Sequence, residues 1–487
     1  MKVWFWLKWF FSLILSIVKY GINLYSILDA QTRLQKSKIA FIIDHQNIQF
    51  VDLKQRTDQL IYEWLKPEFK QKLPQQIGLM MHQDLDSLAT LFALSRLSKD
   101  VVIVNPNLVL HKLQSIIKQK QLFLIGNEDD FNGLDTQKFL IIPSPLTDQN
   151  LTIKFPTLIK LKPSFFNKIS VCSSGSTGIP KIATRKSKPL QSLHLLDLML
   201  RKLNFLHIKQ VFVMTPICHA AGLTASLMAF SFSKTVILQQ RFDAEKAQQL
   251  IEQHQIDCLN LVPTILYRLI ERKALLKSVR YIITGSAPLS VQLVKDVIAH
   301  HPQLQLFNLY GSSETGINLF ATPENLRLHP TSIGKAIQSV KIKITDAQGH
   351  ILQQNQVGIL WTKCAWSITP NQWIQCGDLA LQDSEGFYYL KGRQDNMLIC
   401  GGVNVYPIDL ENIVYQHPAI QYVQAYAVQD DELGQCLAVD IIPTETIDLQ
   451  DLQHWIAAQT PRYLRPKHIH IIQQIETDSI GKPILKL

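Results

Sequence analysis

Short apolar runs alternate with amphipathic helical patterns along the chain. The runs have the length of buried strands, and the longer stretches between them carry apolar residues at helical spacing. Such alternation predicts an α/β architecture with mainly parallel sheets. The first predicted elements are strands at 39–43 and 49–51 about a polar turn at 45–47, a helix at 53–65, a strand at 77–80, a helix at 85–97 and a strand at 101–104.

Four later strands each run into a loop of small residues, and we expect a helix to follow each loop. Ligands of open parallel sheets bind at the carboxyl edge of the strands, where such loops gather. These loops would therefore line one crevice. The strands and their loops are 211–214 with 215–222, 258–262 with 263–264, 281–283 with 284–289, and 306–309 with 310–316.

A polar, unpatterned stretch at 392–396 predicts a domain boundary. The pattern therefore divides the chain into a large N-terminal domain, 29–393, of parallel-rich sheets with helices, and a small α+β C-terminal domain, 394–487. The C-terminal elements, preceded by a hairpin turn at 383–390, are strands at 423–428, 437–442 and 468–472 and a helix at 449–458.

Residues 1–28 differ from the rest because tryptophan, phenylalanine and aliphatic residues crowd together there. Lys8, Ser12, Ser16 and Lys19 recur at helical spacing and form one polar stripe. The lysines interrupt the apolar run before it reaches the about 18 residues of a membrane span, and no convincing cleavage site follows. We expect an amphipathic helix lying in the membrane interface. The alternatives are a helix packed on the domain or on a partner subunit, and a single span.

The composition of the chain limits the classes of molecule that it is expected to bind. With 46% hydrophobic and 18% charged residues over 487 positions, the chain is globular and long enough for more than one domain. Its net charge of +10 favours an anionic nucleotide, coenzyme or lipid. Basic residues are scattered and no nucleic-acid motif occurs. Seven cysteines without CxxC spacing argue against a zinc site or a disulfide framework and predict a cytoplasmic protein.

A loop at 173–181, SSGSTGIPK, follows an apolar strand at 169–172. Phosphate binding needs converging neutral donors and a cation, and this loop offers hydroxyls, glycines and Lys181. It is not a Walker A loop. Taken alone, a solvated Ser/Gly linker explains it equally well.

Other stretches offer complementary chemistry. Tyr310 presents a flat face for a purine, and Glu314 a hard oxygen ligand for Mg²⁺. His219 offers a neutral donor or a plug between pockets. Asp378 suits the paired hydroxyls of a ribose, and Arg393 the same sugar or a phosphate. An ordinary structural role accounts equally well for each residue taken singly.

Together these stretches resemble the adenylate-forming (AMP-binding) superfamily of acyl-CoA synthetases, peptide-synthetase adenylation domains and luciferases, over about residues 30–487. SSGSTGIPK resembles the phosphate loop, and TPICHAAG the motif whose histidine borders the acyl pocket. GSAPLS and YGSSETG resemble the adenine and magnesium segments. CGD, GRQDN, GGVNVYP and IGK resemble the ribose, hinge, coenzyme-side and catalytic-lysine motifs. Their order and spacing carry the resemblance.

The resemblance implies ATP- and Mg²⁺-dependent conversion of a carboxylic acid to acyl-AMP, followed by transfer to coenzyme A. It also implies that the small domain is mobile and turns about Asp395. It assigns catalysis to Lys482, Glu314 and His219, with Glu314 as the metal ligand. The nucleotide and coenzyme residues that it implies are Ser173, Ser174, Gly175, Ser176, Thr177, Gly178, Lys181, Gly285, Ser286, Ala287, Pro288, Tyr310, Gly311, Ser313, Asp378, Arg393, Gly401 and Gly402.

The chain departs from the family pattern at Cys376, where threonine is usual, and at Ile182, where glycine is common. Neither position has a direct catalytic role in the family, so we expect activity. A non-catalytic lipid-binding descendant would have lost Glu314, Asp378 or other site residues, which are present.

The substrate is less clearly marked. Amino-acid adenylation domains place an aspartate in the segment that here is 218–222, which has no carboxylate and many small residues. This segment and the N-terminal helix favour a medium to long fatty acid, taken up by an enzyme peripheral to the inner face of the cell membrane. GGVNVYP also resembles aryl-type ligases, so an aryl acid is an alternative. A carrier-protein phosphopantetheine is the alternative acceptor.

Overall fold

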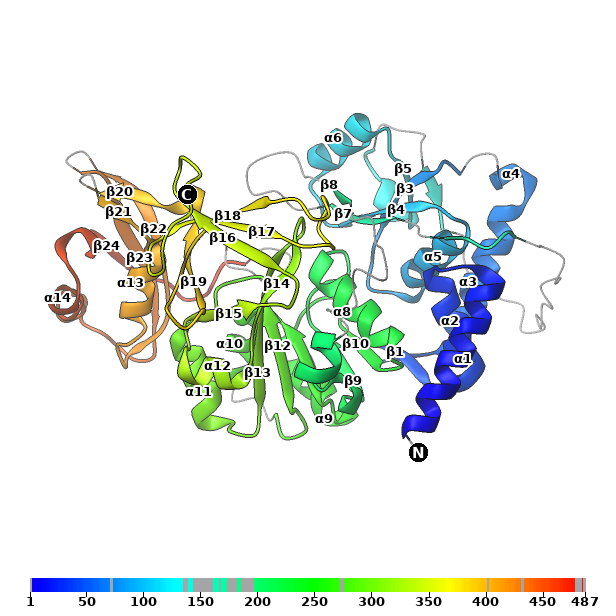
Figure 1. Cartoon of the computed structure of the whole chain (residues 1–487), viewed down its shortest axis with the longest axis horizontal. Helices are drawn as coiled ribbons and strands as arrows, with labels where there is room; N and C mark the ends of the chain where they lie inside the picture. The colour runs from blue at the N-terminus through cyan, green and yellow to red at the C-terminus, as the bar shows by residue number, and fades with distance from the viewer. Residues whose placement is uncertain are drawn as a thin grey trace. The chain divides into compact units, whose positions relative to one another are not determined.

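A computed structural model describes residues 2–70, 73–134, 139–142, 161–165, 168–172, 182–184, 197–271, 276–400, 403–430, 433–477 and 484. The chain forms two compact units, Met1–Asn260 with Leu276–Ser278, and Leu261–Leu275 with Val279–Leu487 (Figure 1). The domain boundaries expected after residues 28 and 393 are a separate division and stay predictions.

The first unit alternates helices and strands as the sequence predicts. Its elements are α1 (Lys2–Tyr20), α2 (Leu24–Gln35), β1 (Ile39–Ile43), β2 (Gln46–Gln49), α3 (Phe50–Leu65), α4 (Pro67–Lys70), β3 (Gln76–Met80), α5 (Leu85–Arg96), β4 (Asp100–Val104), α6 (Leu110–Lys120), β5 (Phe123–Gly126), β6 (Phe139–Ile141), β7 (Ile169–Cys172), β8 (Ile182–Thr184), β9 (Gln210–Val213), α8 (Ala220–Ser231), β10 (Thr235–Leu238), α9 (Ala244–His254) and β11 (Cys258–Leu261).

Two sheets organise the first unit. In one, the neighbours run β11-β9-β10-β1-β2, parallel except for the β1–β2 hairpin. The predicted strand at 49–51 is wrong beyond Gln49, because α3 begins at Phe50. Phe50 is fully buried, and the Gln49 N–H donates to the Asp52 carboxylate at 2.8 Å, which caps the helix.

The second sheet runs β6-β5-β3-β4-β7-β8 and is parallel apart from β8. Strand β7 covers the predicted residues and pairs in parallel with β4. The carboxyl end of β7, where the predicted phosphate loop begins, therefore lies on the same edge of the sheet as the carboxyl end of β4. The loop itself, 173–181, lies outside the described residues.

The N-terminal segment forms helix α1, which packs on α2. The Ser12 hydroxyl donates to the carbonyl of Ala30 at 3.2 Å, and the Ser16 hydroxyl donates to the Asp29 carboxylate at 2.7 Å. The helix is therefore confirmed, but its serines face inward because α2 supplies their acceptors. None of the helices in the described part of the chain is both long and apolar enough to cross a membrane.

The second unit changes from parallel to antiparallel pairing at β13. Its elements are α10 (Pro263–Glu271), β12 (Tyr281–Gly285), α11 (Val291–His300), β13 (Gln305–Ser312), β14 (Gly316–Ala321), α12 (Pro323–Leu328), β15 (Ser332–Ala336), β16 (Lys341–Thr345), β17 (Gly358–Lys363), β18 (Ile374–Gln382), β19 (Tyr388–Arg393), β20 (Leu398–Cys400), β21 (Val403–Val405), α13 (Pro407–Val414), β22 (Ile420–Asp430), β23 (Gly434–Pro443), α14 (Leu449–Gln459) and β24 (His468–Ile471).

Strands β12 and β13 are parallel, whereas β13 and β14 form an antiparallel hairpin. The predicted helix after residues 310–316 is therefore wrong. The turn is tight because a Cβ on Gly311 would lie 1.9 Å from the carbonyl oxygen of Gly316. The hairpin continues into β15, β19, β18, β17 and β16, all antiparallel.

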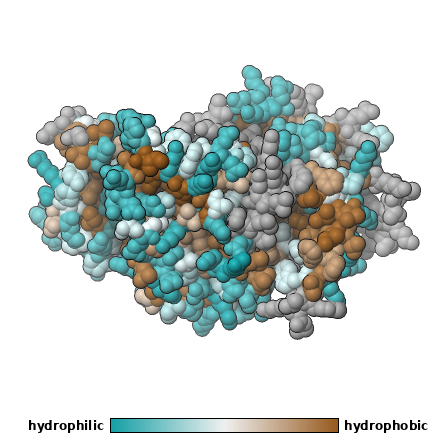
Figure 2. Space-filling view, in the orientation of Figure 1, coloured by the Kyte–Doolittle hydropathy of each residue, from teal (hydrophilic) through white to brown (hydrophobic). Residues whose placement is uncertain are grey.

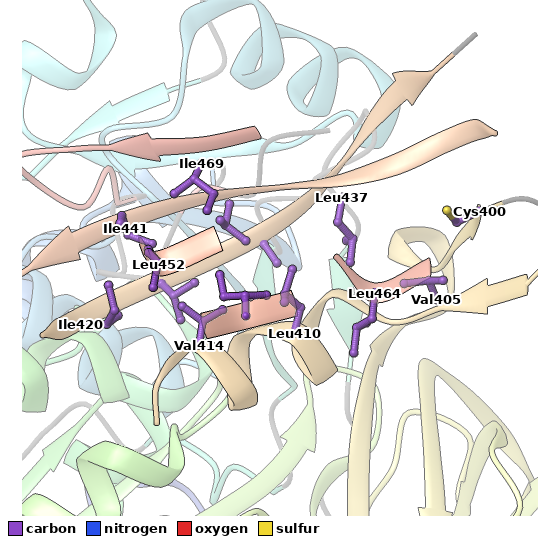
Figure 3. Packing of buried hydrophobic residues seen from close by; sticks show 14 of the residues in the cluster. Cys400, Val405, Leu410, Val414, Ile420, Leu437, Ile441, Leu452, Leu464 and Ile469 are labelled. Atoms are coloured by element: carbon purple, nitrogen blue, oxygen red, sulfur yellow. The ribbon is translucent and has the colours of Figure 1, made fainter. Parts of the chain in front are cut away.

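The C-terminal strands and helices confirm the predicted α+β pattern and enclose a separate core (Figure 3). Strands β22 and β23 form a long hairpin, and β24 adds to β23 in parallel. Asp448 caps α14 by accepting from the Gln450 N–H at 2.7 Å. Among the buried residues of this core are Val405, Leu410, Val414, Ile420, Leu437, Ile441, Leu452, Leu464 and Ile469.

Glu411 makes the stability of this C-terminal part depend on pH. Its carboxylate accepts the Ala425 N–H at 2.9 Å, and burial raises its pKa from 4.5 to about 7. The folded state then holds a proton that the unfolded chain releases, so stability falls as pH rises from about 4.5 to about 7. The loss is at most about 3 kcal/mol.

Urea denaturation at about pH 5 and about pH 8 tests this pH dependence. Glu411→Gln should remain equally stable at both values over this transition. Glu445→Gln, which changes an exposed carboxylate in the same C-terminal part, should keep the wild-type pH dependence. An unchanged pH dependence in Glu411→Gln would contradict the assignment.

Candidate functional site

The second unit brings together three residues that the sequence places far apart. The Tyr310 hydroxyl donates to one carboxylate oxygen of Asp378 at 2.5 Å, and Arg393 Nη1 donates to the other at 3.3 Å. Asp378 on β18 and Arg393 on β19 are register partners, so the hairpin itself sets their contact. Burial raises the pKa of Asp378, with Tyr310 and Arg393 opposing the rise. Burial, followed by Asp378, raises the pKa of Tyr310, which therefore stays a donor.

Tyr310 also belongs to the core. It is 9% exposed and packs with buried residues of β14, β15, β17, β18 and β19. The ring is therefore held rigidly, and its hydroxyl fixes the orientation of the Asp378 carboxylate. A rigid, partly buried carboxylate beside an exposed guanidinium suits two hydroxyls on neighbouring carbons, as in a ribose.

Cys376 and Gly377, which precede Asp378 on β18, both lie against the Arg393 guanidinium. Arg393 Nη1 also donates to the Cys376 carbonyl at 3.2 Å. Gly377 has φ of +74°, and a Cβ there would lie 2.8 Å from the Arg393 guanidinium. Burial raises the pKa of the Cys376 thiol to about 11, so the thiol stays protonated. All seven cysteines are buried, and none forms a disulfide with another.

The predicted adenine segment lies beside Tyr310. Gly285, at the end of β12, pairs in register with Leu309 on β13, and a Cβ on Gly285 would lie 2.4 Å from the Leu309 carbonyl oxygen. Ser286 follows with φ of +68°. Strand β12 ends at Gly285, and the chain bends at Ser286 and Ala287 before Pro288.

Asn308 is a candidate that the sequence analysis missed. It lies two residues before Tyr310, is 5% exposed, and its side-chain Oδ1 has no hydrogen-bond partner among the described residues. A cavity of about 420 Å³ is lined by Asn308, Pro288 and Leu289 and otherwise mainly by residues of β15, β18, β19 and α13, and no member of the Tyr310–Asp378–Arg393 network lines it. A buried acceptor without a donor is costly, so this amide suits an amino group of a ligand such as a purine. Its signal was a polar residue inside an apolar strand.

Glu314 lies in the turn between β13 and β14. Its N–H donates to the Ser312 hydroxyl at 3.2 Å, and its carbonyl accepts from the Ile368 N–H at 2.9 Å. Thr315 is 1% exposed and accepts from the Asn318 amide at 2.6 Å, which fixes the turn further. The described residues contain no cluster of three or more metal-ligating side chains. A single carboxylate still fits Mg²⁺ that is held mainly by phosphates and water.

His219 belongs to the first unit, where it precedes helix α8. It is 7% exposed, and its N–H donates to the Pro216 carbonyl at 3.1 Å. A Cβ on Gly222 would lie 2.4 Å from the carbonyl oxygens of Thr215 and Pro216, so the helix starts tightly against the loop. The remaining predicted site residues lie outside the described ranges: Ser173, Ser174, Gly175, Ser176, Thr177, Gly178, Lys181, Gly401, Gly402 and Lys482.

Family models and known proteins match this chain. The family model of AMP-binding enzymes matches residues 171–368, and the model of the AMP-binding enzyme C-terminal domain matches 409–482. An indoleacetate–CoA ligase of Aromatoleum aromaticum is 28% identical over 331 residues, 64% of each chain. A 2-succinylbenzoate–CoA ligase of Listeria monocytogenes is 28% identical over 273 residues, 55% of this chain and 58% of that one. The chain thus spans less than two thirds of the length of these relatives.

Solved structures share the fold. The o-succinylbenzoate CoA synthetase of Bacillus subtilis, in complex with its acyl-adenylate intermediate, superposes with a TM-score of 0.77 at 19% identity, covering 94% of this chain and 96% of that one. The same enzyme with ATP and a magnesium ion gives 0.75 at 20% identity, covering 94% and 98%.

The fold and the family models define an α/β protein with a large N-terminal domain and a small C-terminal domain of the adenylate-forming class. The chain belongs to the AMP-binding enzyme family.

Proposed function

We propose that the protein is an AMP-forming acid–thiol ligase that activates an apolar carboxylic acid with ATP and transfers it to coenzyme A. The observation that carries this proposal is the Tyr310–Asp378–Arg393 network, in which Tyr310 shares strand β13 with Asn308, whose side-chain Oδ1 has no partner among the described residues. Together these groups suit the ribose and the base of an adenine nucleotide.

In the first half-reaction, a carboxylate oxygen of the acid attacks the α-phosphorus of ATP, and the bond to the bridging oxygen breaks to release pyrophosphate. Asp378 and Arg393 would hold the ribose, while residues 173–181 would bind the β- and γ-phosphates. Lys482 would lie between the carboxylate and phosphate oxygens, and Ser313 near the α-phosphate. The barrier comes from bringing two anions together, so positioning and positive charge lower it.

Glu314 would be the protein ligand of Mg²⁺. Its position in a fixed turn fits an ion that takes few protein carboxylates. When bound, Mg²⁺ neutralises charge on the phosphate oxygens.

In the second half-reaction, the coenzyme thiolate attacks the acyl carbon, and AMP leaves with the electron pair of the broken bond. We propose that the C-terminal domain turns about Asp395, so that Gly401 and Gly402 replace Lys482 near the reacting atoms. Asp395 lies beside the nucleotide residues, since its carboxylate accepts from Arg393 Nε at 3.3 Å. A carrier-protein phosphopantetheine is the alternative acceptor.

The relatives support an aryl acid rather than the fatty acid that the sequence alone favoured, because their names specify indoleacetate and 2-succinylbenzoate. A fatty acid is the second candidate. It is supported by the apolar outward side of α1 and by the lack of a carboxylate at 218–222. His219 would border the acid in either case. We also propose that the enzyme is cytoplasmic and is held peripherally at the inner face of the cell membrane. A fatty acid would suit this location.

A pyrophosphate-release screen tests the proposal. Aryl, fatty and amino acids are each supplied with ATP and Mg²⁺, and thioester formation is then compared with coenzyme A and with a carrier protein. We expect release with an aryl or a fatty acid, no release with amino acids, and thioester with coenzyme A. Absence of release with every aryl and fatty acid would contradict the proposed activity.

A further inference from the structure

We propose that one face of helix α1 is a docking surface for a lipid bilayer that carries anionic headgroups. This outward face consists of apolar side chains, each between 40% and 73% exposed: Leu7, Phe10, Phe11, Ile14, Leu15 and Val18. Figure 2 shows hydrophobic side chains gathered over α1. The inference rests on the proposed peripheral location and names the side chains that would enter the membrane.

The outward face is fixed in orientation by the packing of α1 on the first unit. Ser12 and Ser16 donate to α2, and the Trp6 ring contacts Phe232 with 6.0 Å between ring centroids. The serine hydroxyls are therefore turned toward the protein, on the same side as the half-buried Trp6, Leu13 and Ile17, whereas the six side chains of the outward face point toward solvent.

The geometry of the outward face suits a flat apolar layer. Its residues recur at spacings of three and four from residue 7 to residue 18, so they form one stripe about 17 Å long on the helix surface. Contiguous apolar patches of this kind are uncommon on monomeric proteins unless something covers them. No described helix is long and apolar enough to span a bilayer, so α1 would lie in the interface.

The charges around the outward face identify anionic lipid as the occupant. Lys8 and Lys19 are exposed and stand eleven positions apart along one edge of the stripe, so both lie on the same side of the helix. Helix α1 contains no aspartate or glutamate. A bilayer with anionic headgroups supplies both an apolar layer and negative charge within reach of these lysines.

The test uses the full chain and co-sedimentation with vesicles of phosphatidylcholine alone, or of phosphatidylcholine with about one third phosphatidylglycerol. We expect the wild type to sediment with the anionic vesicles and to be released as salt rises to about 0.5 M. The triple variant Phe11→Gln, Leu15→Gln, Val18→Gln should lower the bound fraction at least about tenfold. Glutamine preserves helix propensity and adds no charge.

A matched triple variant, Val109→Gln, Leu328→Gln, Ile351→Gln, removes side chains of similar exposure elsewhere and should bind as the wild type does. Lys8→Gln with Lys19→Gln should remove the preference for anionic vesicles, whereas Lys118→Gln with Lys120→Gln on α6 should retain it. Thermal melting checks that each variant is folded. Point variants are preferable to deletion of residues 1–28, because Leu28 and Ser26 of α2 are buried.

Three outcomes would overturn the inference. If the wild type stays in the supernatant, the peripheral location also fails. If the wild type sediments and the α1 triple variant sediments equally, only the assigned face fails. If the wild type is a dimer that the α1 triple variant converts to a monomer, the face joins two copies of the chain. Pyrophosphate release by the wild type without vesicles tests the ligase proposal separately.

Discussion

Lys482→Ala is expected to lower acid-dependent pyrophosphate release by at least about a hundred- to a thousandfold. In the proposed first half-reaction, Lys482 places a positive charge between two groups that repel each other, and alanine removes that charge entirely. The second half-reaction does not use this lysine. Thioester formation from supplied acyl-adenylate and coenzyme A should therefore proceed at the wild-type rate.

The comparison of the two half-reactions makes this prediction specific. A variant that simply unfolds would lose both, so a normal second half-reaction is the internal control. Lys486→Ala removes a neighbouring charge on the same tail and should leave both half-reactions intact. Undiminished pyrophosphate release from Lys482→Ala would sink the assignment of this residue.

Asp378→Ala is expected to lower kcat/KM for ATP by about 10²–10⁴-fold. Hydrogen bonds to a charged group contribute about 1.5–3 kcal/mol each, and a ribose would lose two of them, at about 1.4 kcal/mol per tenfold change. Tyr310→Phe removes the hydroxyl that orients Asp378 but keeps the carboxylate. This variant should therefore lose less than about tenfold.

The ATP dependence of the rate separates a nucleotide role of Asp378 from a purely structural one. Asp86 pairs with the buried Arg56 at 2.5 Å in the first unit, so Asp86→Ala removes a comparable carboxylate away from the proposed site. Both alanine variants should lower the melting temperature, but only Asp378→Ala should raise the ATP concentration needed for half-maximal rate. An unchanged ATP dependence in folded Asp378→Ala would show that the carboxylate serves the fold alone.

Periodicity and local chemistry explain why much of the fold could be predicted. Strands β1 and β4 coincide with apolar runs, because a strand buried on both faces needs apolar residues almost without interruption. The motif segments also occur in an order and at a spacing that identified the family. The pattern of apolar and polar residues could not predict the hairpin after Tyr310. Glycines and hydroxyl residues are equally suited to the start of a helix and to a tight turn.

The sequence by itself determined the alternating α/β architecture, the family, the candidate residues and the helical nature of the N-terminal segment. These properties depend on residues that are close together in the sequence. The spacing and type of those residues can therefore predict them directly. Tertiary structure alone decided which groups meet: Asp378 with Tyr310, 68 positions away, and Ser16 with Asp29. It also left the Asn308 side-chain oxygen without a donor among the described residues and turned six apolar side chains of α1 outward, because hydrogen-bond satisfaction and burial depend on elements brought together only by packing.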